Sequence, residues 1–155
     1  MRFLIQFLAS GAFLGYAPVA SGTFGTLAAI PLFFVFDDLR QTSTILYLLS
    51  FIAFVAAAVW IAGAAEELFD EHDSGKIVID EVAGFLATTL FITPTWGNIL
   101  VAFLVFRVAD VLKPYPASLI DAEWKGGAGV TLDDVVSGLY SNLLMHLLIA
   151  LGLLS

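Results

Sequence analysis

The chain has 155 residues, of which 60% are hydrophobic and only 13% are charged. A soluble domain usually carries about a quarter charged residues, so this composition excludes an ordinary water-soluble fold and predicts one membrane-embedded domain over residues 1–155. The formal net charge of −8 excludes nucleic acid as a partner, because nucleic acid requires a basic face, and the absence of cysteine excludes disulfides and thiolate metal sites.

The first half of the chain contains three apolar segments. Phe3 to Leu14 is short, and we expect a helix that lies at the membrane interface. Gly22 to Phe36 contains Pro31 and should end at the polar residues 37–40. Ile45 to Ala65 holds no charge and, at about 1.5 Å per residue, is long enough to cross a hydrocarbon layer of about 30 Å.

The second half adds two short apolar segments and a final long one. Val82 to Ile92 and Ile99 to Val111 are separated by residues 93–98, whose composition is typical of a turn, so they predict a helical hairpin. Val135 to Leu154 predicts a last span. Because spanning elements must satisfy their own backbone hydrogen bonds, the sequence predicts an all-α, multi-helix integral membrane bundle of about four to five apolar helices, some of them short or re-entrant.

The basic residues indicate an orientation in the membrane. If Gly22–Phe36 is the first crossing and the hairpin dips in and returns, only Arg40 lies on the outer side. The positive-inside rule then places the segments 15–26, 66–81 and 107–134 on the cytoplasmic face. The basic residues of that face are Arg2, Lys76, Arg107, Lys113 and Lys125.

Residues 15–26 are rich in glycine and hydroxyl side chains and come before an apolar helix. Free backbone N–H groups at a helix N-terminus suit a phosphate, so Ser21, Thr23 and Thr26 are candidate phosphate-binding residues. The alternative is a plain loop in which Ser21 or Thr23 caps the helix. The segment is not a P-loop, because the Gly-Lys-Ser/Thr ending is absent.

Asp80 and Glu81 stand where a polar loop enters an apolar helix. Asp80 could cap that helix and Glu81 could meet its dipole. Capping needs one acid, however, and two adjacent acids at a membrane boundary are costly unless something neutralises them. In the loop before them, the single histidine His72 is expected to be a surface residue.

Arg107, Asp110 and Lys113 are three residues apart and therefore share one helical face. They could form an intrahelical salt-bridge ladder that keeps a helix end hydrated. Charged residues at the edge of a span usually have a function, which favours a role in a site. Pro114 should stop the helix.

The glycine-rich residues 126–129 are expected to form a turn that leads to Thr131. With Thr131 as the N-cap, Asp133 and Asp134 would lie in the first turn of the last helix. Capping again explains one acid of the pair but not both.

Together these segments supply five carboxylates as candidate metal ligands: Asp80, Glu81, Asp110, Asp133 and Asp134. Oxygen ligands without cysteine or paired histidine favour Mg²⁺ or Mn²⁺ over zinc. Arg107 and Lys113 are candidate ligands of phosphate oxygens. A carboxylate–metal cluster with basic residues at a membrane face predicts phosphoryl chemistry on a lipid headgroup.

Within this site the candidate catalytic residues are Asp80, Asp110, Lys113 and Asp134. The metal would polarise a phosphate oxygen and activate water. A carboxylate could instead attack directly and form an acyl-phosphate.

Four blocks in this order resemble the phosphatidylglycerophosphatase A family: residues 21–26, 77–84, 106–116 and 126–134. The resemblance implies an α-helical, multi-pass enzyme of the bacterial inner membrane. It also implies hydrolysis of phosphatidylglycerophosphate to phosphatidylglycerol and phosphate with Mg²⁺, and its acidic and basic motif residues fall on those named above. Ile79, in place of an aromatic residue, and Thr131, in place of a larger apolar one, depart from the expected pattern.

Two other classes of protein fit the same features. A small ion-coupled transporter or channel also uses acids and arginine, but it predicts charges in the middle of spans. A helical scaffold would use the acids only to anchor helix ends.

Overall fold

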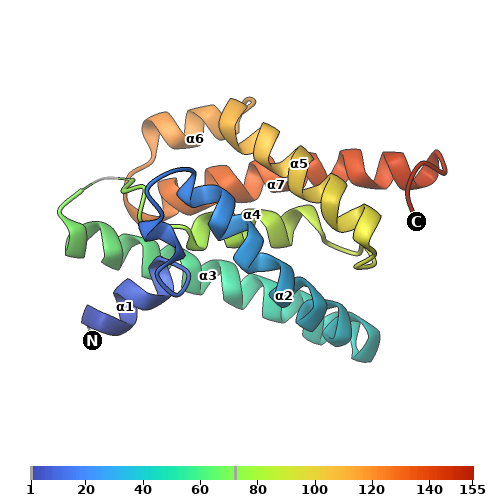
Figure 1. Ribbon diagram of the computed structural model, residues 1–155, viewed down its shortest axis with the longest axis horizontal. Coiled ribbons are helices and arrows are strands. Elements are labelled where there is room, and N and C mark those ends of the chain that lie inside the picture. Colours follow the sequence, from blue (N-terminus) through green and yellow to red (C-terminus); the bar gives the residue numbers. More distant parts are fainter. Residues whose placement is uncertain (1, 72) are drawn as a thin grey trace.

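The computed structural model describes residues 2–71 and 73–155, so the expectation for His72 lies outside the described residues. Within them the chain forms helices and no strand, which confirms the all-α prediction (Figure 1). The elements are α1 (Arg2–Ala9), the 3₁₀ helix η1 (Leu14–Tyr16), α2 (Ser21–Thr42), α3 (Thr44–Phe69), α4 (Ile79–Thr88), α5 (Trp96–Leu112), α6 (Ala117–Glu123) and α7 (Gly126–Ala150).

Two of the described helices, α2 and α3, are long and apolar enough to cross a membrane. Large apolar side chains such as Leu49, Ile52 and Trp60 are exposed on α3, as a lipid-facing helix requires. The bundle therefore has the character expected of a membrane protein. The number of spans beyond these two stays a prediction.

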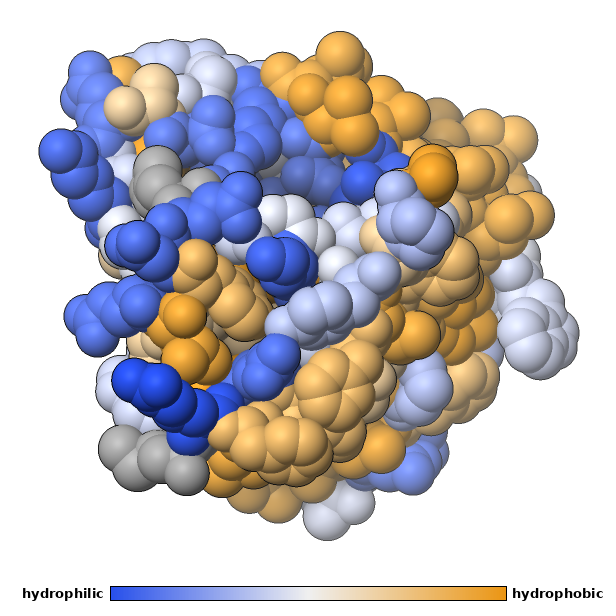
Figure 2. Space-filling model, turned by 60° about the vertical axis from the view of Figure 1, so that its left-hand side comes forward, coloured by the Kyte–Doolittle hydropathy of each residue, from blue (hydrophilic) through white to orange (hydrophobic). Residues whose placement is uncertain are grey.

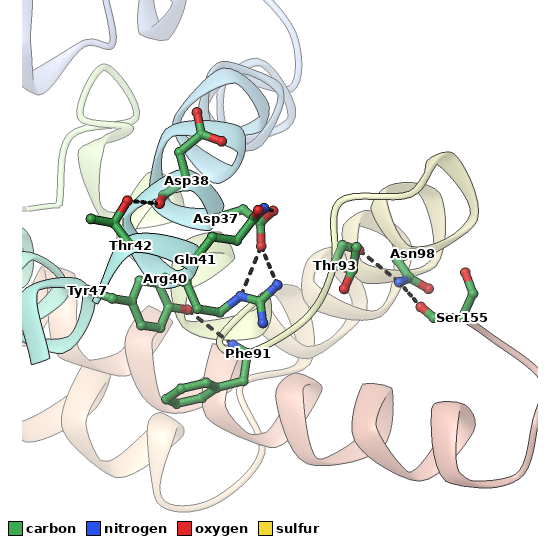
Figure 3. A network of polar contacts seen from close by, with 10 residues as sticks. All are labelled: Asp37, Asp38, Arg40, Gln41, Thr42, Tyr47, Phe91, Thr93, Asn98 and Ser155. Atoms are coloured by element: carbon green, nitrogen blue, oxygen red, sulfur yellow. Dashed lines mark hydrogen bonds and ion pairs between the residues drawn. The ribbon is translucent and has the colours of Figure 1, made fainter. Parts of the chain in front are cut away.

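The helix α2 continues through the polar residues 37–40 to Thr42, so the prediction that the segment ends at these residues is wrong. Its polar end is stabilised along the helix, as Figure 3 shows: Arg40 Nε donates to Asp37 Oδ1 at 2.9 Å, and Gln41 Nε2 donates to Asp37 Oδ2 at 2.7 Å. Because the buried Asp37 carboxylate is paired, the polar residues extend the helix and do not end it. Pro31 lies inside the helix without breaking it.

The first helix is shorter than predicted: α1 ends at Ala9 and not at Leu14. Gly11, Ala12 and Phe13 all have positive φ angles, between 54° and 69°, which is incompatible with a right-handed helix. The chain then passes through η1 before α2 begins.

The last helix begins earlier than predicted, because the glycine-rich residues 126–129 are helical and form no turn. These glycines serve helix packing. A Cβ added to Gly127 would lie 1.9 Å from the carbonyl oxygen of Val59, so α7 touches α3 here through backbone atoms. Thr131 is therefore not an N-cap, and Asp133 and Asp134 lie about two turns inside the helix.

The short helix α4 is the centre of the bundle and is buried along nearly its whole length. Figure 1 shows it between α2, α3, α5 and α7. Phe85 of α4 makes edge-on ring contacts with Phe33 of α2 and Phe106 of α5, at centroid distances of 6.2 and 6.4 Å. These aromatic pairs join three helices in one core.

Two glycines allow α4 and α7 to touch. A Cβ added to Gly138 would lie 2.2 Å from the carbonyl oxygen of Gly84, and one added to Gly84 would lie 2.8 Å from that of Asp134. Such distances are shorter than any normal contact, so only glycine fits at either position. The contact brings the starts of α4 and α7 to the same end of the bundle.

The two ends of the bundle differ in chemistry. Figure 1 shows the loop residues 73–78, α6 and the starts of α4 and α7 at one end, which we call the acidic end, and the turns 42–44 and 89–95 at the other. At that opposite end, Tyr47 Oη accepts from the Phe91 N–H at 3.1 Å, and Asn98 Nδ2 donates to the Thr93 carbonyl at 2.9 Å (Figure 3). Arg40 lies at this end, away from Lys76 and Lys113.

Replacing Gly138 with alanine should destabilise the protein by about 1–3 kcal/mol, because the added methyl group overpacks the contact between α4 and α7. Thermal unfolding in detergent measures the change. The matched control is Gly97→Ala, since a Cβ at Gly97 in the first turn of α5 would meet nothing within 4 Å. That variant should be as stable as the parent or more stable, because alanine favours a helix over glycine by about 1 kcal/mol. Equal stability of both variants would contradict the packing role.

Candidate active site

Three acids from two helices meet at the acidic end. Asp80 and Glu81 occupy the first turn of α4, and Asp134 lies in α7. One carboxylate oxygen from each lies within 4.8 Å of the others. Asp80 is 7% exposed and Asp134 is 3% exposed, so these are buried groups and not surface charges. Residues far apart in the sequence thus form one acidic cluster.

The cluster opens into a cavity of about 190 Å³. Figure 2, in which the acidic end is brought forward, shows hydrophilic residues gathered over this end and apolar residues covering the flank. All five predicted metal-ligand carboxylates reach the cavity, together with Lys113. Its lining consists of Asp73, Ser74, Gly75, Ile77, Asp80, Glu81, Asp110, Lys113, Val130, Asp133 and Asp134.

Arg107 lies beside the cluster and contacts two of its acids. Its Nη1 atom pairs with Asp110 Oδ2 on the same helix and lies 3.9 Å from Glu81 Oε1 on α4. The intrahelical ion pair between Arg107 and Asp110, one of the possibilities that the sequence allowed, is therefore present. The guanidinium also faces Glu81 of α4. Arg107 is thus a cation at the edge of an anionic cavity.

Lys113 does not join the salt-bridge ladder that the sequence offered as an alternative to a site. Its Nζ lies 2.6 Å from Asp133 Oδ2 on α7 and 2.5 Å from Asp121 Oδ1 on α6. Lys113 ends α5 in the left-handed conformation, which turns the chain toward α6. The two basic residues therefore connect α5 to different parts of the site.

The hydroxyl residues of α2 differ in their distance from the cavity. Ala20 is the N-cap of α2, so neither Ser21 nor Thr23 caps the helix. A Cβ added to Gly75, a lining residue, would lie 3.9 Å from Ser21 Oγ, which places Ser21 at the cavity edge. Thr26 is fully buried and donates to the Gly22 carbonyl at 2.8 Å. Neither Thr23 nor Thr26 lines the cavity.

Gly22 at the start of α2 lies against the charged groups. A Cβ added here would be 2.2 Å from Glu81 Oε1 and 2.8 Å from Arg107 Nη1. The first turn of α2 therefore packs directly against the Glu81 and Arg107 side chains, and any residue larger than glycine at position 22 would displace these side chains.

The acids are not explained by helix capping. Val78 is the N-cap of α4, and no side chain caps that helix. Asp80 Oδ1, Glu81 Oε2 and Asp133 Oδ1 are buried without a hydrogen-bond partner among the described residues. An unpartnered buried carboxylate oxygen is costly. Asp80 and Glu81 belong to the cluster with Asp134, and a hard divalent cation of the Mg²⁺ class bound there would satisfy oxygens of these acids, so the donor set fits such an ion.

Burial and mutual repulsion perturb these acids, all of which lie outside α2 and α3. Burial, reinforced by the neighbouring carboxylates, raises the pKa of Asp80 and of Asp134 well above the usual value. Burial also raises the pKa of Glu81 to about 7, and that of Asp133 to about 6 despite the nearby Lys113. The cluster therefore resists carrying all its negative charges unless a cation is present.

Sequence reasoning missed four residues of this site. Asp73, Ser74 and Gly75 form the loop wall of the cavity, and Asp121 on α6 pairs with Lys113. An Asp-Ser-Gly sequence between apolar segments looks like any polar turn. No sequence pattern pointed to Asp121, because the helix α6 on which it lies was not predicted.

Comparison with known proteins gives a consistent result. The family model described as phosphatidylglycerophosphatase A matches residues 7–149. A phosphatidylglycerophosphatase A of Escherichia coli is 33% identical over 135 residues, covering 86% of this chain and 77% of that protein. The phosphatidylglycerophosphatase A of Haemophilus influenzae is 31% identical, covering 88% of this chain and 83% of its own length.

A third relative carries a different name. A putative phosphatidylinositol-3-phosphatase of Bacteroides thetaiotaomicron is 33% identical over 152 residues, which is 92% of either protein. No solved structure matches this chain.

After treatment with a chelator, the protein should become more stable as the pH falls from about 8 to about 5. The folded pKa values of Glu81 and Asp133 exceed those of the unfolded chain, so the folded state binds more protons and gains stability as they protonate. Thermal midpoints in detergent across this pH range measure the effect, and added Mg²⁺ should raise the midpoint most at pH 8.

Glu81→Gln should reduce this pH dependence, because the neutral amide no longer titrates while Asp133 still does. The control Glu67→Gln alters an exposed acid on α3 and should leave the pH dependence unchanged. A midpoint that falls steadily from pH 8 to pH 5 would contradict the description of the cluster.

Proposed function

Because this chain belongs to the phosphatidylglycerophosphatase A family, whose members are phosphatases, we propose that it hydrolyses phosphatidylglycerophosphate to phosphatidylglycerol and inorganic phosphate at the membrane surface. In this reaction a water oxygen forms a bond to phosphorus and the bond between phosphorus and the lipid oxygen breaks. One water proton passes to the leaving lipid oxygen, so the products are an alcohol and phosphate.

One observation carries the proposal: the carboxylates of Asp80, Glu81 and Asp134 meet in a cavity at one end of an apolar bundle, and Arg107 lies beside them. A lipid phosphate matches this arrangement, because its charged phosphate lies at the membrane surface and its acyl chains lie in the hydrocarbon layer. An ion-coupled transporter or channel, the alternative class, would need its charges in the middle of the spans. The position of the cluster at the acidic end therefore supports the phosphatase.

We assign the cation to Asp80, Glu81 and Asp134, and we propose Mg²⁺ because all the donors are carboxylate oxygens. When bound, Mg²⁺ would polarise a phosphate oxygen and lower the pKa of a water molecule. Asp110 and Asp133 line the same cavity but are paired with Arg107 and Lys113. In the proposal Asp110 and Asp133 hold the Arg107 and Lys113 side chains in place. They also add negative charge around the proposed Mg²⁺ site.

The proposed phosphate ligands are Arg107 and Lys113, with Ser21 at the cavity edge. Both basic side chains already contact acids of the site, so an entering phosphate would share them with Asp110 and Asp133. Their charge would offset the negative charge that develops on the phosphoryl oxygens during the reaction. Thr23 and Thr26 lie farther away, and their part in the proposal is to form the first turns of α2.

The proposed location is the bacterial inner membrane, with several crossings and the cavity on the cytoplasmic side. Lys76, Lys113 and Lys125 lie at the acidic end, and Arg40 lies at the other. This distribution satisfies the positive-inside rule when the acidic end faces the cytoplasm.

Asp80→Asn, Glu81→Gln and Asp134→Asn should each lower phosphate release by about 100-fold or more, because each removes one charged ligand of the proposed cation. The assay uses detergent-purified protein and phosphatidylglycerophosphate, with and without a chelator. Chelation should abolish the activity of the parent protein, and added Mg²⁺ should restore it.

The control for this series is Asp38→Asn, the same substitution at an exposed aspartate of the opposite end, which should keep parental activity. Phosphatidylinositol 3-phosphate serves as a second substrate, because one relative carries that activity in its name. If phosphate is released faster from phosphatidylinositol 3-phosphate, the proposed headgroup is wrong but the proposed site residues stand. Full activity in all three acid variants would defeat the site.

Gly22→Ala should lower phosphate release by about tenfold or more, with little change in the thermal midpoint. The added methyl group displaces the mobile ends of Glu81 and Arg107 and leaves the apolar core intact, and small misplacements in a site cost much activity. Gly97→Ala, in an open position of α5, is the control for alanine at a helical glycine. Parental activity in Gly22→Ala would show that these two side chains need not be held by α2.

A further inference from the structure

We propose that the apolar groove between α5 and α7 binds one acyl chain of the substrate, so that this groove sets the preference for chain length. The inference rests on the proposed function, since it assumes that the phosphate enters the acidic cavity.

The groove is a hollow of about 350 Å³ on the flank of the bundle. Leu104 and Val108 form its wall on α5, and Tyr140 and Leu144 form its wall on α7. Leu104, Val108 and Leu144 are 54%, 59% and 42% exposed, so the wall is apolar and open to the hydrocarbon. These properties fit a flexible alkyl chain.

The groove leads to the charged site. A second hollow of about 350 Å³ shares Leu104 and Val108 with it and is also lined by Arg107. The guanidinium of Arg107 lies 3.9 Å from Glu81 of the acidic cluster. Leu104 and Val108 therefore join the two hollows, and Arg107 joins the second hollow to the acidic cluster.

Charge complementarity selects the occupant. A ligand that fits this surface carries an anionic group for Arg107 and an apolar chain that runs from it along α5 toward Leu144. A lipid phosphate has this arrangement, whereas a lipid without an accessible phosphate lacks the anion for Arg107. The chemistry therefore identifies a lipid phosphate ester as the occupant.

A second groove on the same bundle provides a comparison. It has a volume of about 440 Å³ and lies between α3 and α7, with Ile52, Val55 and Leu132 in its walls. Among the described residues, neither groove is lined by a charged residue, but the α5–α7 groove shares Leu104 and Val108 with the hollow that Arg107 lines, and the α3–α7 groove shares no residue with it. Bulk lipid would fill both grooves equally, so a preference of the substrate for the α5–α7 groove is a specific property.

The test fills each groove with a bulky side chain. Leu104→Trp and Leu144→Trp narrow the α5–α7 groove from opposite walls, and Ile52→Trp is the matched control, since Ile52 is a similarly exposed aliphatic residue, at 62%, in the other groove. The measured quantity is kcat/KM for phosphatidylglycerophosphate with two oleoyl chains divided by kcat/KM for the same lipid with two hexanoyl chains. All three variants change exposed residues, and the oligomeric mass of each in detergent is also measured.

We expect this ratio to fall about tenfold in both groove variants, because a long chain loses apolar contacts that a short chain never makes. In Ile52→Trp the ratio should stay within about twofold of the parent. An unchanged ratio in both groove variants, or an equal fall in the control, would overturn the inference. A changed oligomeric mass with an unchanged ratio would also overturn it and would identify the groove as a contact between copies of the chain.

Photocrosslinking separates this inference from the proposed function. A phosphatidylglycerophosphate with a diazirine in one acyl chain should label α5 and α7 at least about fivefold more than α3, and excess dioleoyl phosphatidylglycerophosphate should remove that label. If the parent protein releases no phosphate but this labelling persists, the proposed function fails and the groove stands. If phosphate is released but α3 is labelled as strongly as α5 and α7, the groove fails and the phosphatase stands.

Discussion

The contact between α4 and α7 is the constraint on which the rest of the structure depends. Gly84 and Gly138 allow the two backbones to touch, since a Cβ at either position would meet a carbonyl oxygen at less than 3 Å. A short helix that is buried on every side has little freedom to move, because protein interiors are closely packed. The first turn of α4 is therefore held against α7, and Asp80 and Glu81 are held against Asp134.

Burying these acids together costs free energy in the absence of a ligand. This cost indicates a binding site. Several buried carboxylates repel one another, and three of their oxygens have no partner among the described residues. Arg107 and Lys113 offset part of this charge through Asp110 and Asp133. In the acidic cluster, Asp80 and Glu81 each keep one oxygen beside Asp134 that has no partner in the described part of the chain, an arrangement that suits a small hard cation.

The bundle also separates polar from apolar surface in a way that suits an amphiphile. Most of the charged residues lie at the acidic end, whereas the flanks of α3 and α5 expose leucine, isoleucine and valine. Arg107 lies where the two surfaces meet, since it contacts the acids and also lines an apolar hollow. A substrate with a charged head and apolar chains would contact both surfaces at once.

The sequence by itself determined the class of protein and the identity of the charged residues. Apolar segments of sufficient length predict helices in a membrane, and paired acids at their ends predict a cation site, since both arguments need only local patterns. The tertiary structure decided which of those residues meet. The glycines at 126–129 look like a turn but pack α7 on α3, the pairing of Lys113 with α6 and α7 crosses helices, and the loop 73–75 closes the cavity. Contacts between residues far apart in the chain depend on how helices pack, and a local pattern carries no information about that packing.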